Sequence, residues 1–186
     1  MRRVCTALCV SLLLAGARVS AAELDIKAAV PVLLKVLTYD VNFDSRGVGD
    51  FVILVAGDSD KAERRKALLK ELEGLPSPRV KSRPVRFVGV DVKDETALQA
   101  EVDKARASAV LAVPGTSAAG VKTISEVSQD NQIYALALEV AMVEDALAIG
   151  VTMNGSKAQI VINERASRGV GARFETSVLK LARIIQ

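Results

Sequence analysis

Carboxylates follow two apolar runs of the chain, and they are the side chains best placed for chemistry. Asp58 and Asp60 come directly after one run, while Asp91 and Asp94 end and follow another. In open α/β folds, ligands bind where the carboxyl ends of parallel strands meet. A carboxylate cluster there could hold Mg²⁺ or Ca²⁺ or act as an acid/base pair. Asp58, Asp60 and Asp94 also occupy expected helix N-cap positions. We favour capping, and we predict no metal, no cofactor and no catalytic residue.

Residues 115–123 follow a predicted strand and resemble a phosphate-binding loop. In that pattern a lysine directly follows the second glycine, so that its ammonium group reaches the phosphates. Here Val121 separates Gly120 from Lys122. We therefore predict an ordinary strand-to-helix turn, in which the N-terminus of the helix is the remaining feature that could bind an anion.

The amino-acid composition argues against several classes of enzyme. The chain has no histidine, and its two cysteines, Cys5 and Cys9, both lie near its start. The usual general base at neutral pH and the commonest zinc ligands are therefore missing from the rest of the chain. No serine stands in a Gly-x-Ser-x-Gly elbow between a strand and a helix. We predict that the protein is not an enzyme.

The first 22 residues are typical of a secretory signal peptide. Arg2 and Arg3 precede an apolar run, and small residues fit cleavage after Ala21 or Ala22. The run is shorter than the ~20 residues that span a bilayer, and Cys9 lies inside it rather than at its end, unlike a lipoprotein cysteine. We expect a periplasmic mature chain, residues 23–186, that is cysteine-free and not inserted in a membrane.

The charge balance argues against a polyanionic partner. The chain has 25 Lys and Arg residues against 22 Asp and Glu residues, a formal net charge of +3. Arg2, Arg3 and Arg18 belong to the predicted leader, which has no acid, so the mature chain is neutral. A neutral chain lacks the basic footprint of nucleic-acid binding. We predict no nucleic-acid partner.

Hydrophobic patterning predicts the fold class. Four runs predict strands. Three of them are apolar throughout, as is typical of parallel strands buried on both faces, and these are residues 51–56, 109–113 and 133–138. The fourth, residues 85–92, is mainly apolar. Segments of helical periodicity separate the four runs. We predict a single three-layer α/β domain, with a mostly parallel sheet and helices on both faces.

The two ends of the domain carry their own signals. Residues 24–39 have a broad apolar face, and Pro31 should kink this helix or delay its start. Asn154-Gly155 is a strong signal for a C-terminal β-hairpin. From Gly171 onward, apolar spacing predicts a closing helix that is essential to the fold. Its inward residues are Phe174, Val178, Leu181 and Ile185.

Two polar clusters next to these end elements are the candidates for binding a ligand or partner. One ends the opening helix, and the other surrounds the junction into the closing helix, where exposed connections commonly carry function. The clusters are Lys35, Tyr39, Asp40 and Asn42, and Arg165, Arg168 and Glu175. Capping, packing and solvation are the alternative interpretation of both.

Two segments resemble the YfiR-like family of periplasmic proteins. One is Ile26-Lys-Ala-Ala with residues 33–42, which is similar to the family's opening helix. The other is Ile162-Asn163, a spacer to Gly171, and Ser-Val-Leu-Lys-Leu-Ala-Arg-Ile at 177–184. The signature positions that we expect to be structural are Asn163, Gly171, Phe174, Leu179, Leu181 and Ala182.

This resemblance implies a role and has two departures. Many relatives end the first helix with an aromatic-Pro pair, where this chain has Asp40-Val-Asn-Phe43, and relatives often carry cysteines. The resemblance implies a regulatory or sensor protein of cyclic-di-GMP signalling. Its partner would be the periplasmic part of an inner-membrane signalling protein, either a diguanylate cyclase or a sensor kinase. A periplasmic solute-binding or carrier protein is the alternative. A small ligand and a homodimer stay open.

Overall fold

An eight-stranded sheet runs through the part of the chain that the computed structural model describes, residues 25–154 and 157–186. The strand order is β2-β3-β1-β4-β5-β6-β7-β8. The strands are β1 (Phe51–Gly57), β2 (Arg79–Val80), β3 (Arg83–Asp91), β4 (Ala109–Ala112), β5 (Tyr134–Ala137), β6 (Ile149–Asn154), β7 (Lys157–Asn163) and β8 (Ala182–Ile185). Pairing is parallel except between β2 and β3 and between β6 and β7.

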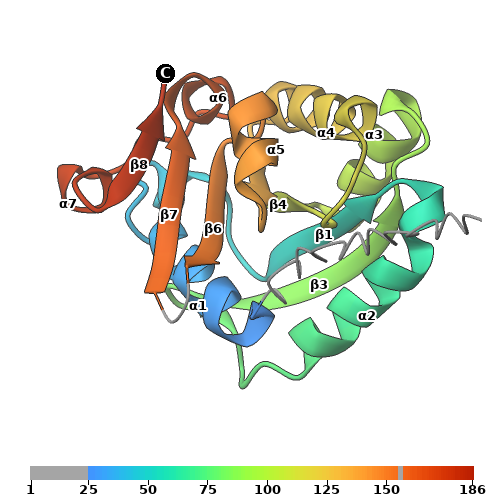
Figure 1. Cartoon of the computed structure of the whole chain (residues 1–186), viewed down its shortest axis with the longest axis horizontal. Helices are drawn as coiled ribbons and strands as arrows, with labels where there is room; N and C mark the ends of the chain where they lie inside the picture. Colours follow the sequence, from blue (N-terminus) through green and yellow to red (C-terminus); the bar gives the residue numbers. More distant parts are fainter. Residues whose placement is uncertain (1–24, 155–156) are drawn as a thin grey trace, which may run out of the picture.

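Helices cover both faces of this sheet. In Figure 1, α1 and α2 lie on one side of the strands, and α3, α4 and α5 lie on the other. The helices are α1 (Ile26–Leu37), α2 (Ala62–Glu73), α3 (Glu95–Ala105), α4 (Ala118–Asp130), α5 (Val140–Asp145), α6 (Glu164–Gly169) and α7 (Thr176–Leu179), with 3₁₀ turns η1 (Phe43–Ser45) and η2 (Ser59–Lys61). The predicted three-layer α/β domain with a mostly parallel sheet is confirmed.

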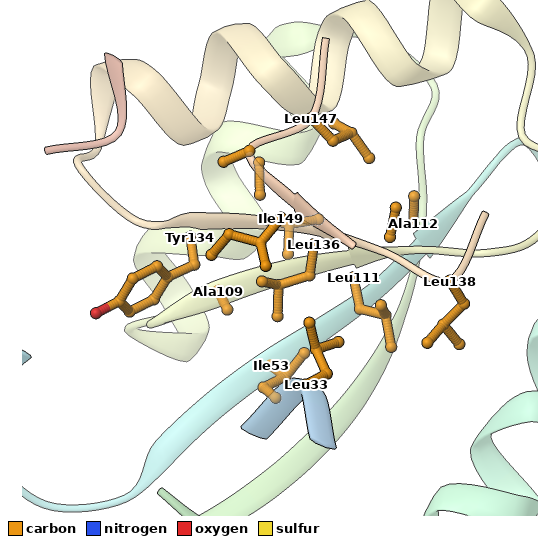
Figure 2. Packing of buried hydrophobic residues seen from close by; sticks show 14 of the residues in the cluster. Leu33, Ile53, Ala109, Leu111, Ala112, Tyr134, Leu136, Leu138, Leu147 and Ile149 are labelled. Carbon is orange, nitrogen blue, oxygen red and sulfur yellow. The ribbon is translucent and has the colours of Figure 1, made fainter. Parts of the chain in front are cut away.

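The central strands form where the sequence is apolar without alternation. Every residue of β1, β4 and β5 is buried, because helices cover both faces of these strands. Leu33 of α1 and Ile53 of β1 lie together in the resulting core, shown in Figure 2. The core thus fixes α1 against the sheet, and the C-terminus of α1 carries the first predicted binding cluster.

The opening helix starts earlier than Pro31 suggested. Asp25 caps α1 by accepting a hydrogen bond from the N–H of Ala28, and the helix runs through Pro31 to Leu37. The Pro31 ring is exposed. The expectation of a delayed start is therefore wrong.

The prediction of a closing helix is wrong in the length of the helix and in the residues that it buries. Helix α7 has four residues, and the chain then enters β8, which pairs parallel with β7. Phe174 and Val178 are buried as expected, but Leu181 is 76% exposed. Ile184 and Ile185 are β-branched residues that suit a strand, and pairing with β7 gives their backbone the partners that a helix would otherwise supply.

The predicted hairpin is confirmed in its strands. β6 and β7 pair antiparallel as far as Asn154 and Lys157, whereas Gly155 lies outside the described residues. So do the predicted leader, Cys5 and Cys9. No helix in the described ranges is long and apolar enough to cross a membrane.

Candidate functional site

The β7–β8 end of the sheet has one face that is only partly covered. In the parallel ladder Ile160 stands beside Ala182, and Ile162 stands beside Ile184. Residues two apart along a strand point to the same face, and here that face meets residues of α1 and α7. Because α7 has only four residues, it covers this face incompletely.

Two mainly apolar cavities flank α7. The first, about 220 Å³, lies between α6, α7 and the strands. The second, about 180 Å³, lies between α7, β7 and α1. The apolar residues lining the first are Ile162, Ala172, Phe174, Leu179 and Ile184, and those lining the second are Val32, Val36, Ile160, Val178 and Leu181.

Exposed apolar side chains gather around the same helix. Of the four large apolar residues that are exposed in the described ranges, Leu181 (76%) and Ile184 (38%) line the cavities. Val41 (47%) lies beside the segment that precedes α7, because its N–H donates a hydrogen bond to the carbonyl of Arg173. The fourth, Val48, lies in the loop after η1. We call Val41, Leu181, Ile184 and the two cavities the α7 surface.

Three free cations border the α7 surface. Lys35, Arg173 and Lys180 are exposed, and none forms an ion pair with another described residue. The exposed acid beside them is Glu175. Two nearby cations form ion pairs, Arg168 with Glu164 and Arg183 with Glu144. The uncompensated charge of the surface is therefore positive.

The structure brings together part of the two predicted clusters. Lys35 and Tyr39 line the second cavity, with the Lys35 ammonium 5.4 Å from the centroid of the Tyr39 ring. Arg168 lines the first cavity, and Glu175 stands at the N-cap position of α7. Arg165 instead lines a polar cavity between α4, α5 and α6, so it lies apart from the other residues of its predicted cluster.

Asp40 is buried, and we withdraw it from the binding cluster. The residue is 2% exposed. Its carboxylate accepts hydrogen bonds from the Tyr134 hydroxyl (2.7 Å), Arg46 Nε (2.9 Å) and the backbone N–H groups of Asn42 (3.0 Å) and Arg173 (2.9 Å). Asn42 is structural as well, because its side chain donates a hydrogen bond to the carbonyl of Gly171.

The groups around Asp40 form a satisfied polar junction. The Arg46 guanidinium stacks over the Tyr134 ring at 4.3 Å and donates to the carbonyls of Gln132 and Val170. Burial raises the pKa of Tyr134, Arg46 opposes this rise, and the hydrogen bond to Asp40 adds to it. The tyrosine therefore stays protonated and donates to the carboxylate. The junction fixes the approach to α7 against the end of α1.

The carboxyl edge of the sheet is closed by side chains of the protein itself. Asp58 accepts hydrogen bonds from the Ser117 N–H (2.6 Å) and hydroxyl (3.2 Å), and Glu139 accepts one from the Gly115 N–H (3.0 Å). These donors lie where α4 begins and where an external anion would bind. Ser117 caps α4, which begins at Ala118, so a strand-to-helix turn joins β4 to α4 here.

The aspartates of this edge differ in role. Asp94 caps α3 through the Ala97 N–H, as predicted. Asp60 pairs with Lys61, and Asp91 pairs with Arg65. The side chains of Asp58 and Asp60 do not cap their own helical turn, so capping is wrong for these two. Within the described ranges, no group of three or more His, Cys, Asp or Glu residues could hold a metal.

Most of the signature residues are structural. Asn163 caps α6 through the Ala166 N–H and donates to the carbonyl of Val143. Gly171 has a φ of +70°, a backbone conformation that favours glycine. Phe174 is buried, and Leu179 and Ala182 are half-buried. Leu181 is exposed, so the expectation that it is structural is wrong.

Sequence reasoning missed Val41, Arg173, Lys180 and Ile184. The consecutive β-branched residues Ile184 and Ile185 favour a strand. This signal could have predicted β8 in place of the end of a helix. No sequence signal singles out the other three, because they meet only when the end of α1 is placed beside α7.

Neither a family model nor a curated protein matches the chain, but solved structures match its fold. A conserved domain protein from Vibrio cholerae has 15% identity and a TM-score of 0.55, covering 73% of this chain and 54% of that one. A ligand-free, open substrate-binding protein with adhesive properties from Clostridium difficile has 12% identity and a TM-score of 0.52, over 73% and 54%.

A third similar structure is the ABC domain in complex with L-Trp from Streptococcus pneumoniae. It has 16% identity and a TM-score of 0.50, covering 73% of this chain and 56% of that one. At these identities the likeness shows a shared fold. This chain spans about half the length of the matched structures. The shared fold is an α/β fold that the substrate-binding protein from Clostridium difficile also has.

Proposed function

We propose that the protein is an extracytoplasmic binding protein that contacts a protein partner through its α7 surface. The observation that carries this proposal is that the exposed Leu181 and Ile184 line two apolar cavities on either side of α7. A contiguous apolar patch on a soluble domain is a feature of protein-interaction sites. The likeness to substrate-binding proteins supports a binding role for the fold.

The resemblance to YfiR-like proteins supports a more specific partner, the periplasmic part of an inner-membrane diguanylate cyclase or sensor kinase. The protein would then be regulatory, and its effect would come from occupying the partner rather than from catalysis. Apolar side chains of the partner would enter the two cavities, as anchor residues do at interface hot spots. The Asp40 junction would hold α1 and α7 as a rigid platform for them.

Crosslinking in intact cells tests this proposal. A photoreactive residue is placed at Leu181 or at Ile184 in separate variants, with Val48 as the matched exposed control. We expect the first two to crosslink to one membrane protein that has a periplasmic domain, and the control not to do so. Equal crosslinking at all three positions, or none at the α7 surface, would overturn the proposal.

Solute binding is the second candidate, and the fold likeness favours it. One matched structure is a complex with L-Trp, and open parallel sheets bind ligands at the carboxyl edge of their strands. In this chain that edge carries both charge signs, but the groups are already paired, Asp58 with Ser117 and Asp91 with Arg65. A solute would therefore have to displace contacts within the protein.

Thermal unfolding in the presence of single amino acids separates the two candidates. A ligand at 100 times its Kd stabilises a protein by about 2.7 kcal/mol, so a binding event would raise Tm visibly. We expect no shift with L-Trp or other amino acids. A rise that disappears in Asp58→Asn would instead place a solute at the carboxyl edge and favour the solute-binding function.

A further inference from the structure

We infer that the segment recognised by the α7 surface is acidic as well as apolar, a conclusion that rests on the proposed protein-binding function. The three free cations lie among the apolar residues rather than apart from them. Lys35 lines the second cavity and Arg173 lines the first. Lys180 stands in the chain between Leu179 and Leu181, which line one cavity each.

Desolvation makes acidic groups on the partner necessary. A partner that fills both cavities also removes water from the ammonium and guanidinium groups beside them. Removing water from a charge is unfavourable unless a counter-charge replaces it. Within the described ranges these three cations have no counter-ion of their own. The partner must therefore supply carboxylates around its apolar anchors.

The same charges argue against a second copy of this chain as the occupant. In a two-fold symmetric contact the same patch lies on both sides. The excess positive charge of Lys35, Arg173 and Lys180 would then face the same excess on the other copy, with Glu175 as the exposed acid among them. Like charges across an interface disfavour association. An acidic, apolar segment of a different protein can fill the cavities with apolar side chains and pair its carboxylates with the three cations at their rim.

Peptide selection provides the test. Random peptides are selected for binding to the protein, and enriched peptides are then titrated against the parent and three double variants. The rim variant reverses the charge of two of the cations that border the α7 surface, with Arg173→Glu and Lys180→Glu. The matched control reverses the charge of two exposed lysines on α2, with Lys66→Glu and Lys70→Glu. Leu181→Ser with Ile184→Ser removes apolar contacts at exposed positions, so folding should be kept. Circular dichroism checks this for all three.

We expect the enriched peptides to combine acidic and apolar residues. Reversal of the rim charge should weaken their binding by about tenfold at low salt, because two attractive pairs become repulsive. The loss should shrink at high salt, and the α2 control should bind as the parent does.

Two failures are distinguishable. If the apolar variant weakens binding but the rim variant does not, the acidic character is wrong and the proposed function stands. If neither variant changes the binding of any enriched peptide, both are wrong. Sedimentation adds one further outcome, since a dimer that the rim variant abolishes would make a second copy the occupant and overturn the inference.

Discussion

At the scale of single residues, Asp40 connects more parts of the fold than any residue that the sequence singled out. Its carboxylate joins the end of α1 to β5, to the loop after η1 and to the segment before α7. The pair with Arg46 is almost entirely shielded, with side-chain exposures of 0% for Asp40 and 10% for Arg46. Breaking a buried pair leaves an uncompensated charge, and this governs the first prediction.

Asp40→Asn should lower the free energy of unfolding by about 3–5 kcal/mol, because Arg46 is left buried without its counter-charge. Urea unfolding measures the change. The control is Asp44→Asn, which breaks an exposed pair with Lys81 and should cost less than about 1 kcal/mol. Equal losses in both variants would contradict the structural role of Asp40.

Tyr134 predicts a dependence of stability on alkaline pH. Its pKa is raised in the folded protein, so the unfolded chain loses the phenolic proton first. The contribution is fully present below the unfolded pKa, near 10. Above that pH it declines by about 1.4 kcal/mol per pH unit until the folded pKa is reached. Unfolding from pH 9 to pH 12 should show this decline, and Tyr134→Phe should lose this component. Parallel profiles would contradict the prediction.

At the scale of elements, the α7–β8 segment is divided between core and surface. Val178 is buried and Leu181 is exposed, although both are apolar and three residues apart. Val178→Ala should cost about 2 kcal/mol through lost burial and the cavity left behind. Leu181→Ala should change stability by less than about 0.5 kcal/mol. A larger loss for Leu181→Ala, measured by urea unfolding, would restore a closing helix that buries this residue.

Asp58 links the end of β1 to the start of α4, and its removal tests that link. Asp58→Ala should destabilise the protein by about 1–2 kcal/mol, because two donors of Ser117 lose a charged acceptor. Asp60→Ala, which removes only the adjacent pair with Lys61, should cost less than about 0.5 kcal/mol. Thermal melts of both variants decide whether Asp58 acts across the sheet edge.

The sequence predicted those elements whose signals are local. The wholly apolar strands β1, β4 and β5 and the β6–β7 hairpin are in place. The prediction of a closing helix failed because Phe174, Val178, Leu181 and Ile185 match helical spacing. Pairing with β7 instead makes the end of the chain a strand. Helices α5 and α6 have six residues each, too few for a clear periodicity. The α7 surface depends on contacts across more than one hundred residues of chain, such as the Asp40–Arg173 hydrogen bond, which no local pattern contains.

At the scale of the whole molecule, the segment after α1 forms backbone hydrogen bonds with the segment before α7. The backbone of Asp40 bridges to Phe174, and the Glu175 N–H donates to the carbonyl of Tyr39. The described domain should therefore unfold in one cooperative transition, as small domains usually do. Far-ultraviolet circular dichroism and tyrosine fluorescence should give the same midpoint in urea. An earlier transition in one signal would show that the C-terminal segment unfolds separately.

The two tyrosines have a spectroscopic consequence. The chain has no tryptophan and two tyrosines, so its near-ultraviolet aromatic signal comes mainly from two known places. Tyr39 is half-buried beside the second cavity, whereas Tyr134 is fully buried under Arg46. A partner seated on the α7 surface would change the emission of Tyr39 and leave Tyr134 as an internal reference. The protein thus carries an optical reporter of occupancy that needs no label, and Tyr39→Phe would silence it.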